Sequence, residues 1–402
     1  MLVINYIGVT AALFLLVLPF LFSSLGAGSW ALGSVLAAFF CVFITSIKRK
    51  AILIPWGGLA LLLAIILANL LVTCIYYGAL PSVRQLLSIA ILILLYIASC
   101  GVASWLATQR LCALVKCCNA TAWFLLAAAF GSKLIGLKAL ASHKPILYFS
   151  EPSHFAIALA PLAVFLCITA RRREVLFFLS LLLASSLYFE NATLLVLLTI
   201  CATVSLLRVG IGLPQLFAVL FLVSVAAVPM LLQSEYFGPR ISLSDENLSS
   251  LVYLRGLESA QDSLIEPPFL GVGFQMMGSR VHQTKTVALL QKLNQESLNS
   301  HDGGFLLAKL ITEFGLFGAI LACAYFFVLS RGLLSVVPAI RSGCLSQANC
   351  IYLASCASVI LQLLVRGGGY LGPFVCYALL TFQFRPSHPL LATKLIDSVA
   401  KK

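Results

Sequence analysis

Residues 174–207 read EVLFFLSLLLASSLYFENATLLVLLTICATVSLL, an almost unbroken apolar run of 34 residues. As one α-helix, this run would be about 51 Å long, which exceeds the roughly 30 Å hydrocarbon core of a bilayer. Its only polar interruption, from Tyr188 to Thr193, lies near the middle. The run therefore predicts two short helices with a turn at Glu190. A carboxylate at such a break is either functional or a cap for the second helix.

The rest of the chain has the same apolar character. Of its 402 residues, 61% are hydrophobic and 10% are charged, whereas about a quarter of the residues of soluble domains are charged. This composition excludes a cytosolic enzyme, a nucleic-acid-binding protein and a disordered chain. Further runs long enough to cross a bilayer lie at 4–24, 28–47, 54–79, 86–107, 113–131, 152–170, 214–233, 304–330, 349–365 and 369–384. Together they predict an all-α polytopic integral membrane protein with about twelve transmembrane helices.

The basic residues predict the orientation, because cytoplasmic loops are enriched in Lys and Arg. Twelve spans with the N-terminus inside place 15 of the 26 basic residues inside, but only Glu174 and Asp397 among the 13 acids. The net charge of +13 is then a topology signal and indicates no acidic partner. A single crossing by 174–207 would invert all later segments, and the short C-terminal loops favour the twelve-span arrangement. Both termini are therefore expected in the cytoplasm.

Three regions follow from this topology. Residues 1–233 hold the first nine spans and an outer loop at 132–151, and residues 304–402 hold the last three spans and the C-terminus. Between them, 234–303 forms one large outer loop. In that loop, leucines at helical spacing from Leu251 predict an amphipathic helix that ends at 266–268, and a second helix is expected at about 284–299. The residues between the two helices, 269–273, are expected to form a turn.

Glu151 and His154 open the sixth span in the stretch SEPSHFA, 150–156. Ser150 can cap this helix and Pro152 suits its first turn, so capping alone is one interpretation. The other interpretation is a carboxylate and an imidazole standing together at the membrane surface. Glu151 would then accept a proton from an attacking hydroxyl.

Arginines on the outer face form a second group of candidates. Arg255 is either a solvated partner of Glu258 or a guanidinium fork for a phosphate. Arg240 and Arg280 are weaker candidates of the same kind, and Arg84 is another outer arginine near a membrane end. Arg366 begins the stretch RGGGY, 366–370, whose glycines form either a flexible connector or an anion nest that ends at Tyr370.

His301 opens the tenth span in the stretch SHDGG, 300–304. Lys309 and Glu313 follow it at helical spacing, well inside the membrane. A buried structural pair is favoured for these two, because an unpaired charge there costs at least about 2.5–3.5 kcal/mol. His301, at the mouth of the helix, is the better catalytic candidate, because an imidazole holds or passes a proton near neutral pH.

Three motifs, in order over residues 150–318, resemble the bacterial O-antigen polymerase and ligase superfamily. EPSHFA, 151–156, resembles the Glu-Pro-Ser motif of O-antigen polymerases of the Wzy type. Arg255 with PFLGVG, 268–273, resembles the arginine and Pro-x-x-Gly-x-Gly turn, and HDGG, 301–304, with EFGLFG resembles the His-containing loop and Gly-x-x-Gly helix. The arginine-x10-glycine repeat of some polymerases is absent, and Asp302 stands where the ligase loop usually has Asn.

The resemblance implies a GT-C-type membrane glycosyltransferase at the periplasmic face of a bacterial inner membrane. It would transfer the growing glycan from undecaprenyl pyrophosphate to the non-reducing end of a new lipid-linked repeat unit. Its partners would be these lipid-linked glycans and membrane lipid, and a chain-length-regulating membrane protein is left open. Catalytic roles fall on Glu151, Arg255 and His301. Binding of pyrophosphate or glycan falls on Arg84, His154, Arg280, Arg366 and Tyr370.

Two other functions stay open. An O-antigen ligase shares the donor but transfers the glycan to lipid A–core, and the Glu-Pro-Ser motif favours polymerase over ligase. A lipid-linked oligosaccharide flippase also has many spans, but its charges line a cavity across many helices and its loops are short. The sequence has no Walker A motif, no Asp-x-Asp motif and no Cys/His spacing typical of zinc. It therefore predicts no cofactor and no metal.

Overall fold

The computed structural model describes most of the chain as helix and, in the described part, contains no strand. The residues it describes are 30–47, 54–78, 80–134, 146, 149, 151–244, 247–267, 269–279, 284–367 and 369–386. The predicted first span, 4–24, lies outside them. Seven described helices are long and apolar enough to cross a membrane: α3 (Trp56–Tyr77), α4 (Val83–Ala107), α5 (Leu111–Leu134), α6 (Pro152–Thr169), α9 (Leu213–Leu232), α13 (Leu306–Ser342) and α14 (Gln347–Leu364).

The run at 174–207 forms the predicted pair of helices, α7 (Arg172–Tyr188) and α8 (Ala192–Arg208), which pack against each other. Glu190 lies in the turn between them with a φ of 49°. The cap of α8 is Asn191, whose side chain accepts hydrogen bonds from the N–H groups at the start of the helix. The capping role considered for Glu190 therefore belongs to its neighbour.

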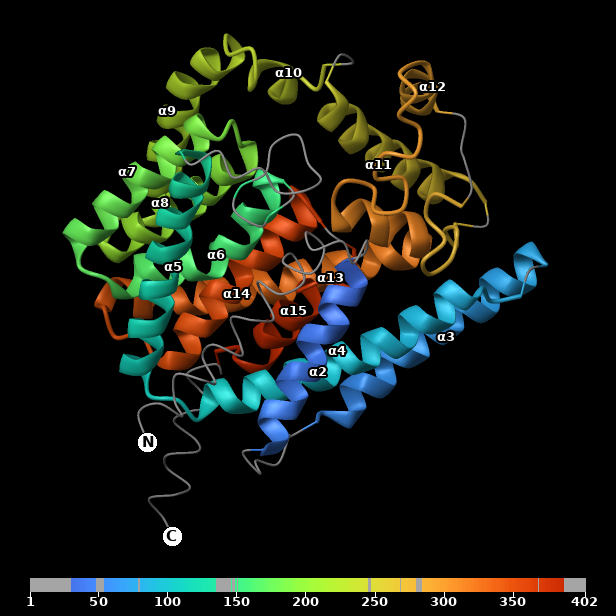
Figure 1. The fold of residues 1–402 in the computed structure, drawn as a ribbon, viewed down its shortest axis with the longest axis horizontal. Helices are drawn as coiled ribbons and strands as arrows, with labels where there is room; N and C mark the ends of the chain where they lie inside the picture. The colour runs from blue at the N-terminus through green and yellow to red at the C-terminus, as the bar shows by residue number, and fades with distance from the viewer. Residues whose placement is uncertain are drawn as a thin grey trace.

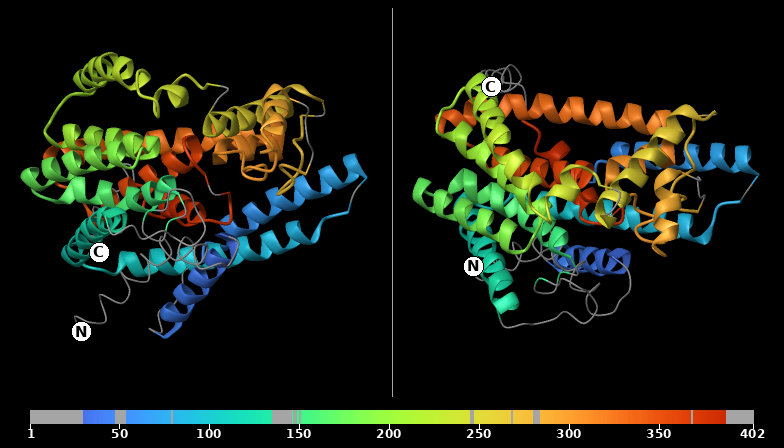
Figure 2. Two further views of the ribbon diagram at one scale, coloured as in Figure 1. Left: turned by 45° about the horizontal axis from the view of Figure 1, so that its top comes forward. Right: turned by 90° about the horizontal axis from the view of Figure 1, so that it is seen from above.

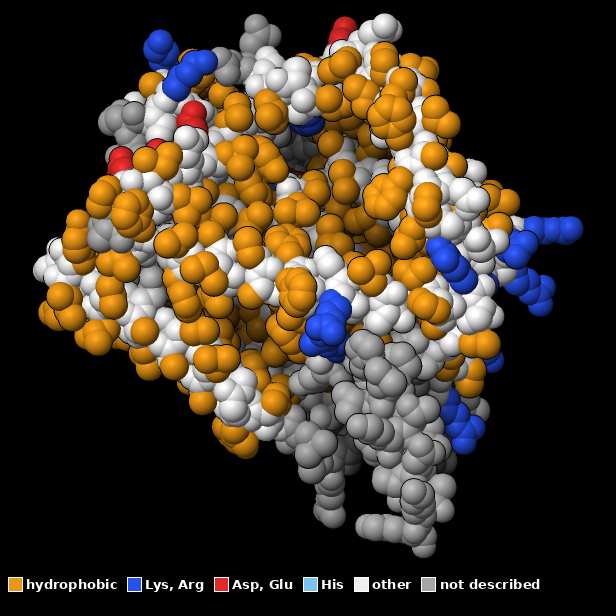
Figure 3. Space-filling view, turned by 180° about the vertical axis from the view of Figure 1, so that it is seen from behind, with side chains coloured by type: hydrophobic (Ala, Val, Ile, Leu, Met, Phe, Trp, Pro, Cys, Tyr) orange, Lys and Arg blue, Asp and Glu red, His pale blue; other side chains and the backbone are white. Residues whose placement is uncertain are grey.

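Helix α6 lies at the centre of the molecule, where its side chains are buried from His154 to Ile168. It packs against α5, α8 and α14, and the short helix α15 (Phe374–Gln383) packs against α14 and α4. Helix α2 (Trp30–Ile47) packs against α4, while α3 projects from the body (Figures 1 and 2). Apolar side chains cover most of the face in Figure 3, and basic side chains form a few separate groups. Such a surface is typical of a protein surrounded by lipid.

Three helices of the large loop, α10 (Gly238–Ile241), α11 (Leu248–Ile265) and α12 (Lys285–Lys292), lie along one end of the molecule (Figure 1). Helix α11 confirms the helix predicted from Leu251 onward, and it ends at Glu266 as expected. The second predicted helix, 284–299, is wrong in length. Asn294 has a φ of 52°, and a residue in this left-handed region ends a helix.

Helix α13 is broken at Gly315, and the loop at 269–274 enters the break. Gly315 has φ 57° and ψ −138°, which only glycine adopts readily. The expected turn at 269–273 therefore packs into the break between the two halves of α13. It supplies backbone hydrogen bonds that the break removes, because backbone groups within a bilayer must be paired inside the protein. Three backbone hydrogen bonds join the two segments: Val272 N–H to the Thr312 carbonyl (2.9 Å), Gly273 N–H to the Glu313 carbonyl (3.0 Å) and Leu316 N–H to the Phe269 carbonyl (2.9 Å).

Asn69 on α3 ties the loop to the broken helix. Its side chain accepts a hydrogen bond from Phe274 N–H at 2.8 Å and donates one to the Glu313 carbonyl at 3.3 Å. Asn69→Leu is expected to destabilise the protein by about 1–3 kcal/mol for each group left unsatisfied, seen as a lower unfolding midpoint in detergent. Thr199→Val is the control, because the hydroxyl of this exposed residue bonds only its own helix. Equal midpoints for the two variants would contradict the role of Asn69.

Candidate functional site

Five of the eight predicted site residues fall into two clusters near helix ends. We call Glu151, His154 and Arg366 the carboxylate cluster. We call the second set the histidine cluster: Arg84, His301, Asp302, Lys309 and Glu313. The first cluster joins the start of α6 to the α14–α15 loop, and the second joins the starts of α4 and α13.

Glu151 and Arg366 form an ion pair across 215 positions of sequence, through a single guanidinium nitrogen. Arg366 Nη2 donates to both carboxylate oxygens of Glu151, at 3.1 and 2.8 Å. Ser153 donates its hydroxyl to Glu151 Oε2 at 2.9 Å, and His154 Nε2 lies 3.8 Å from the same oxygen. Ser150, the predicted cap, lies outside the described residues. Glu151 holds the N-cap position but makes no capping hydrogen bond, so its carboxylate is directed to Arg366.

The carboxylate of Glu151 stays ionised because its neighbours outweigh its burial. Burial raises the pKa of Glu151. Arg366, His154 and the Ser153 hydroxyl together lower it by more than burial raises it, so the pKa falls below its ordinary value of 4.5. Arg366 Nη1 makes no hydrogen bond to any residue that the structure describes. The cluster thus presents a fixed anion beside a guanidinium with free donors.

This shift sets the pH dependence of the pair. A depressed folded-state pKa means that the stabilisation is complete above pH 4.5 and is lost as the pH falls through the lower folded value. The unfolding midpoint of wild type is therefore expected to exceed that of Glu151→Gln from pH 7 down to about 4.5 and to converge with it below. Glu235→Gln, at an exposed carboxylate, is the control. A difference that vanishes well above pH 4.5 would contradict the assignment.

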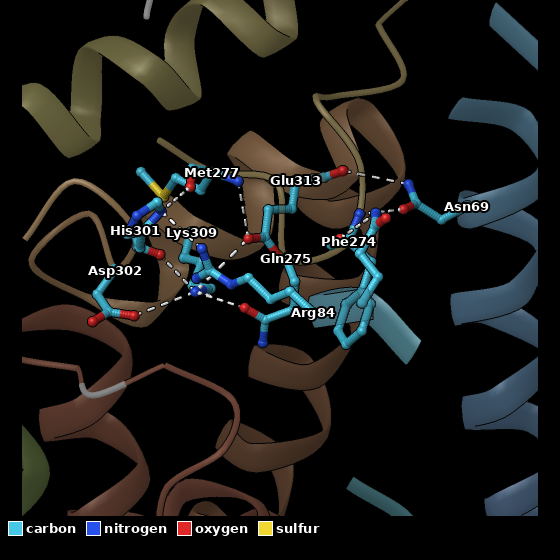
Figure 4. Close-up of polar contacts among 10 residues, drawn as sticks. Asn69, Arg84, Phe274, Gln275, Met277, His301, Asp302, Lys309 and Glu313 are labelled. Atoms are coloured by element: carbon cyan, nitrogen blue, oxygen red, sulfur yellow. Dashed lines mark hydrogen bonds and ion pairs between the residues drawn. The ribbon is translucent and has the colours of Figure 1, made fainter. Parts of the chain in front are cut away.

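His301 lies in a loop, and one nitrogen of its ring, Nδ1, faces both Arg84 and the Met277 carbonyl. Its Nδ1 is 3.0 Å from Arg84 Nη1 and 2.9 Å from the Met277 carbonyl oxygen (Figure 4). The prediction that His301 shares a helix with Lys309 is wrong, because α13 begins at Leu306. Two residues with positive φ, at 303 and 304, separate the ring from the helix. Both Arg84 and His301 are exposed, so a ligand can reach them.

Lys309 and Glu313 form the predicted buried pair. Their side chains are 2% and 0% exposed, and Lys309 Nζ lies 3.8 Å from Glu313 Oε1. Lys309 Nζ also donates to the His301 carbonyl at 2.6 Å and to Asp302 Oδ1 at 3.3 Å. Figure 4 shows this ammonium group at the centre of the histidine cluster, where a fourth neighbour, Gln275 Oε1, lies at 3.4 Å.

The α14–α15 loop brings the two clusters together. Gly367 N–H donates to the Gly304 carbonyl at 3.1 Å, one residue after Arg366. Gly369 has a φ of 77°, and a Cβ there would lie 3.0 Å from Asp302 Oδ1. Tyr370 follows, with its ring 5.4 Å from Lys309 Nζ. The predicted glycine connector therefore packs closely against the loop that carries His301.

Arg255 is buried and is therefore not exposed to a ligand, as one of its two interpretations required. It lies on α11, is 7% exposed, and its Nη1 donates to the Glu296 carbonyl at 2.6 Å. Burial lowers the pKa of this guanidinium. The alternative partner, Glu258, instead accepts a hydrogen bond from the Thr286 hydroxyl at 2.7 Å. Arg255 thus holds the turn after α12, and Arg280 lies outside the described residues.

The fold and these clusters define a multi-pass helical membrane protein whose charged side chains gather at helix ends. In the described part of the chain, no three His, Cys, Asp or Glu side chains are grouped to hold a metal ion. Comparison with known proteins found no matching family model, no matching curated protein and no matching solved structure.

Proposed function

We propose that the protein is an O-antigen polymerase that joins lipid-pyrophosphate-linked repeat units. The observation that carries the proposal is the contact of Glu151, in the Glu-Pro-Ser motif, with Arg366 beside the histidine cluster. Sequence resemblance selects Glu151 and His301 independently of any geometry. Glu151 contacts Arg366, and the loop that carries His301 accepts a hydrogen bond from Gly367 N–H, so both residues lie beside one short loop, which supports a common site.

Both clusters would contribute to each part of the transfer. The leaving group is a lipid pyrophosphate, so fixed cations are needed where negative charge develops, and Arg366 and Arg84 are the accessible guanidinium groups. The acceptor hydroxyl needs a group that orients it and takes its proton, and Glu151 or His301 fits this role. Arg255 acts here by holding protein backbone. Holding two glycans side by side supplies much of the remaining rate enhancement.

The proposal includes the twelve-span topology in a bacterial inner membrane, with both termini cytoplasmic and the site periplasmic. The seven long helices, the four shorter ones (α2, α7, α8 and α15) and the span at 4–24 make up the twelve. Arg84, Glu151, His301 and Arg366 all lie at helix ends that this topology places outside. The GT-C-type fold belongs to the same proposal.

Deletion of the gene in its host tests the function, with lipopolysaccharide separated on a gel. A single-repeat band without the longer ladder is expected, and the wild-type gene should restore the ladder. Loss of every O-antigen band would replace the proposal with ligase or flippase. Accumulated outward-facing lipid-linked polymer would then select the ligase. An unchanged ladder would contradict all three.

A further inference from the structure

Lys309 is a buried cation whose contacts converge on the loop that carries His301. Its ammonium donates to the His301 carbonyl and contacts the Asp302 carboxylate. Its charge is balanced by Glu313 one turn later on the same helix. An ammonium group 2% exposed in a membrane helix is costly unless it is paired in this way.

The loop has no regular structure of its own to fix His301. Gly303 and Gly304 have φ values of 61° and 77°, and they connect the histidine to α13 without helical hydrogen bonds before Leu306. The ring Nδ1 lies within hydrogen-bond distance of both Arg84 Nη1 and the Met277 carbonyl, and its protonation decides which of the two it bonds. Lys309 holds the backbone of the same residue. The position of the imidazole therefore depends on a side chain eight residues later.

Folding alone gives little reason for this arrangement. Replacing both members of a buried ion pair by apolar residues of similar size is often neutral or stabilising. Leucine or methionine would fill the space of Lys309 and Glu313, but neither could donate to the His301 carbonyl. An apolar core would reproduce neither the hold of Lys309 on the loop nor the hydrogen bond that Glu313 accepts from Met277 N–H at 3.4 Å.

We infer that Lys309 is a positioning residue, which sets the His301 imidazole against Arg84 by holding the His301 carbonyl and the Asp302 carboxylate. Glu313 lies 3.8 Å from the buried ammonium and accepts a hydrogen bond from Met277 N–H, and it makes no hydrogen bond to the described residues of the loop at 301–304. The inference rests on the proposed function for the role of His301 and on the structure alone for its placement.

The test compares the chemical reactivity of His301 in purified, detergent-solubilised variants. Diethylpyrocarbonate modifies accessible imidazoles, and mass spectrometry of the peptide that contains His301 gives its rate. Lys309→Met/Glu313→Met removes the hold and both charges together, so it avoids an uncompensated buried charge. Its His301 reactivity is expected to rise about tenfold, the effect of losing one charge-assisted hydrogen bond. Its kcat for glycan transfer is expected to fall about 10²-fold, as for an ångström-scale misplacement.

Two variants separate positioning from a general structural role. Lys309→Arg keeps a charged donor and is expected to retain His301 reactivity near the wild-type rate. Lys292→Met removes an exposed lysine on α12 and should change neither reactivity nor kcat. If the double variant does not accumulate, Asp302→Asn replaces it, because it weakens the hold while leaving the buried pair in place. A smaller rise in His301 reactivity is then expected.

Unchanged His301 reactivity in a folded double variant, or in Asp302→Asn if that variant replaces it, would overturn the inference. So would a Lys309→Arg protein as reactive as the double variant. The reagent needs no glycan, so the reactivity result stands even if wild type shows no polymerase activity. In that case the proposed function fails and the placement of His301 by Lys309 remains.

Discussion

Arg366→Met is expected to lower the rate of glycan transfer by about 10²–10³, the usual effect of removing one preorganised group from a charged transition state. Arg366 Nη2 lies 2.8 Å from the Glu151 carboxylate, and Nη1 makes no hydrogen bond to any residue that the structure describes. Without it, Glu151 faces an anionic leaving group with no cation between them. Cells that carry the variant should show short chains in place of the long ladder, and purified protein should show the lower kcat.

Three comparisons test the role of Arg366 further. Arg366→Lys keeps the charge on one nitrogen but loses the remaining planar N–H donors of the guanidinium, so an intermediate rate is expected. Arg341→Met removes an exposed arginine near the end of α13, where it donates to the Ile211 carbonyl, and should leave chain length unchanged. A double-mutant cycle with Glu151→Gln should be strongly non-additive, because the two side chains are in contact. Long chains from Arg366→Met at normal membrane abundance would refute the role.

Gly315→Ala is expected to have the largest effect on stability. The φ of 57° is strained for alanine, at about 1–3 kcal/mol. A Cβ at this position would also overlap the Phe269 carbonyl oxygen and lie 2.6 Å from Gly271 N. The loop would then leave the break, and the buried groups it satisfies would lose their partners at about 1–3 kcal/mol each. Much lower abundance and a lower unfolding midpoint are the expected measurements.

Gly343→Ala is a matched control on the same helix. Gly343 has a φ of 70°, and a Cβ there would meet no atom within 4 Å. It therefore measures the cost of a positive φ without any clash, in the left-handed region with ψ 5°, whereas Gly315 has ψ −138°. Gly271→Ala should resemble Gly315→Ala, because its Cβ would lie 2.5 Å from Gly315 N. Equal losses at positions 315 and 343 would show that the inserted loop adds nothing to stability.

Local patterns predicted several parts of this structure. The length of the run at 174–207 against bilayer thickness predicted the α7–α8 hairpin, because a continuous helix would overshoot the membrane. Leucine spacing predicted α11, and the four-residue separation of Lys309 and Glu313 predicted their pairing. In each of these cases the deciding interaction lies within one element or between neighbours in sequence.

Other parts depend on distant residues or on backbone conformation. The Glu151–Arg366 pair joins positions 215 residues apart, and no local pattern selects one outer arginine over another. The stretch EFGLFG is compatible with an unbroken helix, since glycine is frequent in transmembrane helices. Only the loop that fills the break identifies Gly315. The exact start of α13, which placed His301 outside the helix, was set by two glycines with positive φ.

The loop at 269–274, which fills the break of α13, makes the segment at 234–303 depend on the long helices. This dependence matters both for synthesis of the protein and for the design of chimeras. Residues 269–274 are synthesised before α13, so their backbone groups have no partners on that helix until it has been made. A chimera that exchanged only 234–303 would separate this loop from Asn69 and Gly315, the residues that fit it. The smallest unit that can be transplanted therefore includes α3 and the first half of α13 together with the outer segment.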